Sequence, residues 1–174
     1  MSATSSSIAR VPLVDRTAAT GTVRAVLDQV HGAFGATPNM FRAVANSPAA
    51  LKSMWGSFGA LGGGTLGARL GEQIAVAVAD RNACSYCLAA HTVLGQKAGA
   101  SAEEMAAAQL GESSDPKTRA ALLFALKVVG QRGQVSGLLR LGQERPLEAV
   151  PRQGLQRLAP HARVAGQLDV ILGD

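Results

Sequence analysis

The sequence predicts an all-α protein, both from its composition and from its turn signals. Its 174 residues are 47% hydrophobic but only 3% aromatic, and alanine, valine and leucine supply most of the apolar part. Because alanine has the highest intrinsic helix propensity, such a composition favours closely packed helices. Strand signals are nearly absent, since the chain has no Asn-Gly hairpin turn and few runs of threonine, tyrosine or isoleucine.

Three helices are predicted in the N-terminal part of the chain. From Thr20, apolar residues recur at the spacing of an amphipathic helix, which two following glycines should end. Pro38 suits the first position of a second helix, and Ser47 followed by Pro48 is a typical start for a third. The apolar residues assigned to these helices are Val23, Val26, Leu27, Val30, Met40, Phe41, Val44, Leu51, Met54, Trp55 and Phe58.

A glycine-rich connection separates these helices from the next group. The run from Leu61 to Thr65 lacks the lysine of a phosphate-binding loop, and no strand precedes it. The apolar segment from Leu66 to Asp80 has the length of a buried helix, although its Val-Ala-Val alternation leaves a strand open. Further helices are predicted from Cys84 to Lys97, from Ser101 to Leu110 and from Asp115 to Val129.

The chain is expected to have three parts. These are a lead-in at residues 1–17, a helical domain at residues 18–130 and an atypical C-terminal segment at residues 131–174. The last part has six arginines, no lysine and no aromatic residue, and its three prolines would each interrupt a helix.

The charge distribution and the hydropathy of the chain argue against a nucleic-acid-binding, a secreted or a membrane protein. The net charge is +5, but the basic residues are scattered and lack interleaved aromatic residues, which argues against nucleic-acid binding. The N-terminus lacks the apolar core of a signal peptide, and no stretch is long enough to span a membrane. We therefore expect a cytoplasmic protein without a membrane partner. In a reducing compartment, two closely spaced cysteines indicate a catalytic or metal-binding pair rather than a structural disulfide.

The cysteine pair is the most informative motif in the chain. Cys84 and Cys87 form a CxxC motif, and His91 follows four residues later. A haem attachment site is excluded because Leu88, not histidine, follows the second cysteine. A zinc site would need a fourth ligand or a bound water, and the other two histidines are distant in the sequence.

Redox chemistry needs fewer groups. On a helix, Cys84, Cys87 and His91 share one face, and the side chains of Cys87 and His91 are close enough to meet. A cysteine in the first turn is favoured as a thiolate, which points to Cys84 as the nucleophile, whereas the neighbouring base favours Cys87. Glu72 is the candidate carboxylate partner of the histidine, because a charge in so apolar a segment needs a partner. The alternative is that Glu72 only lies in the first turn of its helix, where the helix dipole favours an acid.

The spacing Glu72, Cys84, Cys87, His91 resembles that of the alkylhydroperoxidase AhpD-like, or carboxymuconolactone decarboxylase, superfamily, and more narrowly its peroxidase-related branch. The similarity covers roughly residues 10 to 130. Further similar segments are Thr37-Pro38-Asn39-Met40-Phe41-Arg42, Ser47-Pro48, Asp115-Pro116-Lys117 and Leu122-Leu123-Phe124-Ala125.

The resemblance implies an AhpD-like helical bundle that assembles into homo-oligomers such as trimers or hexamers. It implies an enzyme, a thiol-dependent peroxidase, that reduces alkyl hydroperoxides through a disulfide between Cys84 and Cys87. In that scheme Cys87 attacks the peroxide, Cys84 resolves the sulfenic acid, and Glu72 and His91 relay protons. A dithiol protein, lipoyl-bearing in classical members, is the electron donor, and neither a cofactor nor a metal ion is predicted. The decarboxylases of the superfamily generally lack the cysteine pair. The alternative is a non-redox helical module that binds a metal or a protein partner through the same face.

The C-terminal segment departs from this resemblance. Family members continue beyond Val129 with amphipathic helices, whereas this chain continues with sequence rich in arginine, proline and glycine. One hypothesis is a shifted reading frame beyond about Val135, which an unshifted gene sequence there would reject.

Overall fold

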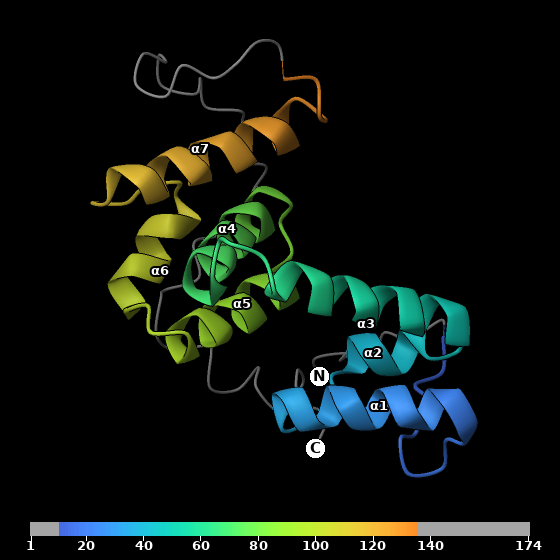
Figure 1. Cartoon of the computed structure of the whole chain (residues 1–174). Coiled ribbons are helices and arrows are strands. Elements are labelled where there is room, and N and C mark those ends of the chain that lie inside the picture. The colour runs from blue at the N-terminus through green and yellow to red at the C-terminus, as the bar shows by residue number, and fades with distance from the viewer. Residues whose placement is uncertain (1–10, 136–174) are drawn as a thin grey trace, which may run out of the picture. The chain divides into compact units, whose positions relative to one another are not determined.

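The computed structural model describes residues 11–135, and this part of the chain contains seven α-helices and no strand (Figure 1). The all-α fold class is therefore confirmed. The chain divides into two compact units with the boundary between Gly63 and Gly64, within the predicted glycine-rich connection. The predicted C-terminal segment lies almost wholly outside the described residues, and the three predicted domain bounds stay predictions.

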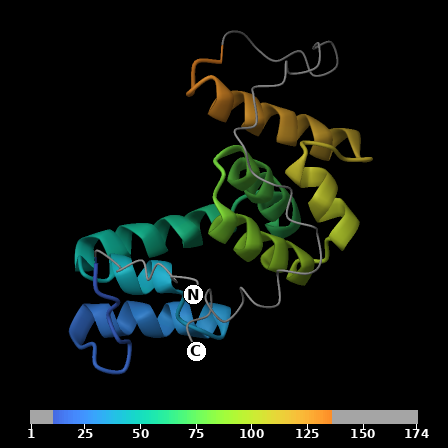
Figure 2. The same ribbon diagram turned by 180° about the vertical axis from the view of Figure 1, so that it is seen from behind.

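The first unit contains α1 (Gly21–Phe34), α2 (Asn39–Val44) and α3 (Pro48–Gly62), which lie side by side in both views (Figures 1 and 2). Thr20, from which the amphipathic pattern is predicted, is the N-cap residue of α1. Gly35 ends this helix in the left-handed conformation, with φ 76°, and its N–H binds the carbonyl of His31. Pro38 precedes α2 as its N-cap residue instead of being its first helical residue.

An aromatic cluster centres on Phe41 in the core of the first unit. The ring of Phe41 is 1% exposed and lies 5.5–5.8 Å from the rings of Phe34, Trp55 and Phe58. These rings meet tilted or edge to face, the arrangements that the charge distribution of aromatic rings favours. The buried residues of this core are Val26, Leu27, Val30, Phe41, Ala45 and Leu51.

The second unit contains α4 (Ala68–Arg81), α5 (Ser85–Lys97), α6 (Ala102–Gln109) and α7 (Pro116–Gly130). The segment that left a strand open is helix α4, and it packs against each of the other three helices (Figure 1). Alanines at several contacts let the helices approach closely. The buried core residues of this unit are Val76, Ala77, Ala100, Met105, Ala108, Leu122 and Leu126.

Side-chain caps fix the starts of the last two helices. The hydroxyl of Ser101 accepts the N–H of Glu104, whose carboxylate in turn accepts the N–H of Ser101, which is the predicted capping box. The carboxylate of Asp115 accepts the N–H of Thr118 at the start of α7. Among the residues described, no helix is both long enough and apolar enough to cross a membrane.

Candidate functional site

The cysteine pair lies where α4 turns into α5. Asn82 ends α4, and Ala83 then adopts φ 55°, in the left-handed region that non-glycine residues rarely occupy. This turn directs the N–H of Cys84 to the carbonyl of Ala79, at 3.0 Å. The backbone therefore reverses within three residues, and Cys84 becomes the N-cap residue of α5.

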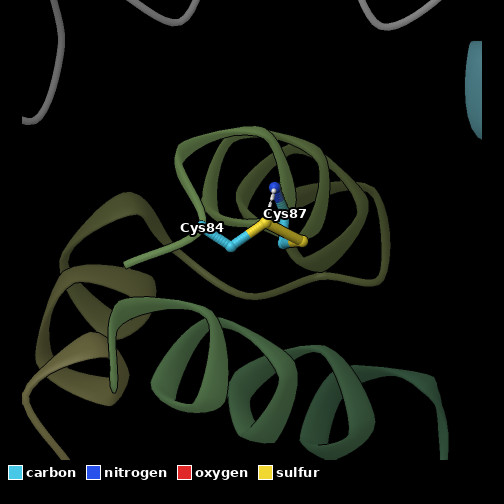
Figure 3. Close-up of a disulfide and its surroundings, with 2 residues drawn as sticks. All are labelled: Cys84 and Cys87. Carbon is cyan, nitrogen blue, oxygen red and sulfur yellow. Dashed lines mark hydrogen bonds between the residues drawn. A yellow bond between two sulfur atoms is a disulfide. The ribbon is translucent and has the colours of Figure 1, made fainter. Parts of the chain in front are cut away.

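Cys84 and Cys87 are joined by a disulfide across the first turn of α5 (Figure 3). Their Cα atoms lie 5.3 Å apart, within the usual range for a disulfide. The Sγ of Cys84 also accepts the backbone N–H of Cys87 at 3.2 Å, as a serine would at an N-cap (Figure 3). Both side chains are half-buried. The helix terminus thus stabilises partial negative charge at the Cys84 sulfur.

Glu72 and His91 form the second pair of the site. Oε2 of Glu72 lies 2.7 Å from Nδ1 of His91, so the two side chains bridge α4 and α5. Glu72 is the fifth residue of α4, beyond the first turn, where no acidic residue is found. It is therefore the partner of the histidine, and the helix-dipole interpretation is wrong. The side chains are 23% and 30% exposed, so solvent reaches this pair.

The two pairs are neighbours along α5. His91 follows Cys87 by four residues, which places the two side chains one turn apart on the same face of the helix. The structure thus brings all four predicted site residues onto the α4–α5 hairpin, as one bonded sulfur pair and one hydrogen-bonded acid–imidazole pair. Within the described residues, no hydrogen bond joins one pair to the other.

Tyr86 lies between the two cysteines in the sequence. Burial raises the pKa of its phenol, so the hydroxyl stays protonated over a wide pH range. The spacing of the motif did not predict the raised pKa of Tyr86, because the burial of its side chain depends on how α5 packs.

Other polar groups of this unit gather away from the cysteine pair. A groove of about 610 Å³ is lined by residues from the first half of α4, from α6 and from the α6–α7 connection, including Arg69, Gln73, Glu104 and Ser114. None of the four predicted site residues lines it. In the part of the chain that the structure describes, no group of three His, Cys, Asp or Glu side chains is placed to hold a metal ion.

Known proteins share the sequence pattern and the fold of this part of the chain. Residues 48–129 match the model of the carboxymuconolactone decarboxylase family. The fold is similar to the crystal structure of the alkylhydroperoxidase AhpD core from Rhodospirillum rubrum, with a TM-score of 0.53 and 28% sequence identity. That match covers 74% of this chain and 94% of the other. No curated protein sequence matches the chain significantly. Residues 48–129, which contain all four predicted site residues, thus match the carboxymuconolactone decarboxylase family, and the all-helical fold is similar to that of an alkylhydroperoxidase AhpD core.

Proposed function

We propose that this protein is a thiol-dependent peroxidase that reduces alkyl hydroperoxides through Cys84 and Cys87. The superfamily contains both peroxidases and decarboxylases. The observation that carries the proposal is the Glu72–His91 hydrogen bond, placed one helical turn from a cysteine pair close enough to form a disulfide. Acid, imidazole and thiol in this order form the arrangement that activates a nucleophilic cysteine.

The pairing assigns a task to each ring nitrogen of His91. Nδ1 is engaged by the Glu72 carboxylate, which leaves Nε2 as the nitrogen that exchanges a proton with the thiol. The negative carboxylate stabilises the imidazolium that forms when Nε2 takes the Cys87 proton. Partial exposure of both side chains gives this proton a path to solvent.

The first half-reaction consumes one hydroperoxide. The Cys87 thiolate attacks one oxygen of the O–O bond, forming an S–O bond while the RO⁻ fragment leaves and takes the proton held by His91. Cys87 is then a sulfenic acid and the product is the alcohol. The Cys84 thiolate next attacks the Cys87 sulfur, forming the S–S bond and releasing hydroxide, which is protonated to water. In sum, one hydroperoxide and two thiols give one alcohol, one water and one disulfide.

Cys84 is suited to the second step. Its sulfur occupies the N-cap position and accepts the N–H of Cys87, so a thiolate there is stabilised before the peroxide arrives. The one-turn spacing of Cys87 and His91 on α5 and this capping bond therefore divide the work between the two thiols. We accordingly assign Cys87 as the nucleophile and Cys84 as the resolving cysteine.

The second half-reaction returns the site to its dithiol form. A dithiol protein, with a lipoyl group as one candidate, transfers two electrons and two protons to the disulfide and is itself oxidised to a disulfide. We further propose that the protein works as a homo-oligomer, a trimer or a hexamer, in the cytoplasm.

Thiol titration and mass measurement test the proposal. The fully reduced protein is treated with one equivalent of an organic hydroperoxide, alongside Cys84→Ser, Cys87→Ser and the double variant as the thiol-free control. We expect the wild type to lose two thiols and Cys84→Ser to gain one oxygen at Cys87. Cys87→Ser should keep its thiol, because the remaining Cys84 lies about two helical turns from His91, whereas Cys87 lies one turn from it.

Other outcomes would support other functions. Thiols that stay inert to hydroperoxide while the chain retains zinc would support the non-redox binding module. A sulfenic acid trapped in Cys87→Ser instead of Cys84→Ser would reverse the assigned roles.

A further inference from the structure

Gly95 lies at a close approach between α5, α4 and α6. It is buried, and a β-carbon at this position would lie 2.4 Å from Cε and 2.5 Å from Sδ of Met105. The same β-carbon would lie 3.4 Å from Cβ of Glu72. Carbon and sulfur atoms do not approach to 2.5 Å without bonding, so any side chain at residue 95 must displace the methionine or the helix.

Met105 has little room to yield. It is 2% exposed on α6 and belongs to the core of the second unit, where Val76, Ala77 and Leu122 are fully buried. A methionine can change its rotamer, but a close-packed interior has few spaces to receive the displaced thioether. An added methyl group must therefore displace the thioether of Met105 within this core or move α5 away from its neighbours.

Gly95 is in register with the acid–imidazole pair. It follows His91 by four residues, so the glycine and the histidine lie on the same face of α5, one turn apart. Cβ of Glu72 is the α4 atom nearest to where a β-carbon of residue 95 would lie. Oε2 of the same glutamate contacts Nδ1 of His91. Gly95 thus lies beside the residue that supplies the carboxylate and one turn from the residue that supplies the imidazole.

We propose that Gly95 is a positioning residue, whose missing side chain lets α5 approach α4 closely enough for His91 to bind Glu72. Met105 is its counterpart, because the methionine fills the space that a side chain at residue 95 would take. This inference rests on the proposed function for what the Glu72–His91 pair does, but not for the existence of the pair.

The test compares Gly95→Ala with Gly71→Ala, a matched control on α4 where an added β-carbon meets nothing within 4 Å. The ring-nitrogen chemical shifts of His91, measured by NMR, report the Nδ1 hydrogen bond without reference to activity. We expect Gly95→Ala to lose this signature and Gly71→Ala to keep it. Hydroperoxide consumption should fall roughly 10- to 100-fold in Gly95→Ala, the usual effect of a misplacement near 1 Å.

A rescue series in the Gly95→Ala background makes the test specific. With Met105→Leu, Met105→Val and Met105→Ala, the His91 signature and the rate should recover as residue 105 becomes smaller. The same series decides the matter if Gly95→Ala alone does not fold, since Gly95→Ala/Met105→Ala should then fold and keep the pair.

Three results would overturn the inference. They are an intact His91 signature in Gly95→Ala, no dependence of the signature on the size of residue 105, or, where Gly95→Ala does not fold, a Gly95→Ala/Met105→Ala variant that does not fold either. If the wild type consumes no hydroperoxide while the NMR signature follows the expected pattern, the proposed function fails and the positioning role stands.

Discussion

Nδ1 of His91 lies 2.7 Å from Oε2 of Glu72, and this contact joins the middle of α5 to the first half of α4. The two residues are 19 positions apart in the sequence, so only the reversal of the chain between α4 and α5 brings them together. The carboxylate holds the ring in one orientation and one tautomer, which is the usual task of the acid in such a pair.

Replacing Glu72 with glutamine removes the negative charge of this side chain while keeping its size and shape, so the variant tests the role of the charge. The amide oxygen of Glu72→Gln is able to accept a hydrogen bond from Nδ1, but it does not stabilise an imidazolium. We expect oxidation of Cys87 by hydroperoxide to slow on the order of 100-fold, within the range that general acid–base catalysis contributes. Single-turnover kinetics with the reduced protein measure this rate.

Glu112→Gln is the matched control for this prediction. Glu112 is an exposed carboxylate on the α6–α7 connection, so the same change there should leave the rate within about twofold of wild type, as for other surface substitutions. Equal losses in the two variants would mean that the rate responds to overall charge and not to the Glu72–His91 pair.

Two adjacent leucines on α7 test how the second unit is held together. Leu122 is fully buried in the core, whereas Leu123 is 38% exposed. Leu122→Ala removes buried methyl groups and leaves a cavity, so the free energy of unfolding should fall by about 2–5 kcal/mol. Leu123→Ala should lower it by less than about 1 kcal/mol. Urea unfolding of both variants under oxidising conditions gives the two values, and similar losses would contradict the assigned burial.

The helices were predictable because their signals are local. Ser101 and Asp115 cap the predicted helices with their own side chains, and Gly35 ends α1 in the conformation that glycine favours. Each of these signals depends on residues within four positions, so the sequence displays it directly. Helix bounds differ from the predicted ones by one or two residues, as at Pro38, where capping and first-turn positions are hard to separate.

The candidate site was predictable in its residues but not in its contacts. The sequence left Glu72 with two interpretations, because its partner belongs to another helix. The contact between Gly95 and Met105 depends on how α5 and α6 pack, and no local signal distinguishes this glycine from the others. Ala83 was not predicted either, because alanine seldom adopts a positive φ.

Asp28 should make the stability of the first unit depend on pH. Its carboxylate binds Nε of Arg24 and Nη1 of Arg16, each at 2.6 Å, and these hydrogen bonds lower the pKa of Asp28 in the folded chain. A lowered pKa means that the folded state binds the proton less readily than the unfolded state. The contribution is therefore fully present above the ordinary carboxyl pKa and is lost as the pH falls through the lowered value.

Unfolding measured as a function of pH tests this dependence. The difference in unfolding free energy between the wild type and Asp28→Asn should be largest near neutral pH and should shrink as the solution becomes acidic. It should also decrease with added salt, because the carboxylate and its partners are partly exposed to solvent. A difference that stays constant with pH would show that the ion pairs do not contribute.

Replacing Ala83 with glycine should stabilise the folded protein. Its φ of 55° lies in the left-handed region, where an L-residue other than glycine costs about 1–2 kcal/mol. Glycine removes that cost, but it also gains about 0.5–1 kcal/mol of conformational freedom in the unfolded chain. Because Ala83 is exposed, its methyl group adds little packing to offset the strain. Ala83→Gly should therefore raise the free energy of unfolding by roughly 0.5–1 kcal/mol.

Ala90→Gly supplies the opposite case on the same hairpin. Ala90 lies within α5, where glycine is unfavourable, so this variant should lose about 1 kcal/mol of stability. Both variants are unfolded in urea with the Cys84–Cys87 disulfide intact, so that the bond contributes equally. Opposite signs are expected because one alanine has helical backbone angles and the other has left-handed ones. A loss of stability in Ala83→Gly would contradict this prediction. It would mean that the added conformational freedom of glycine in the unfolded chain outweighs the strain of alanine at this φ.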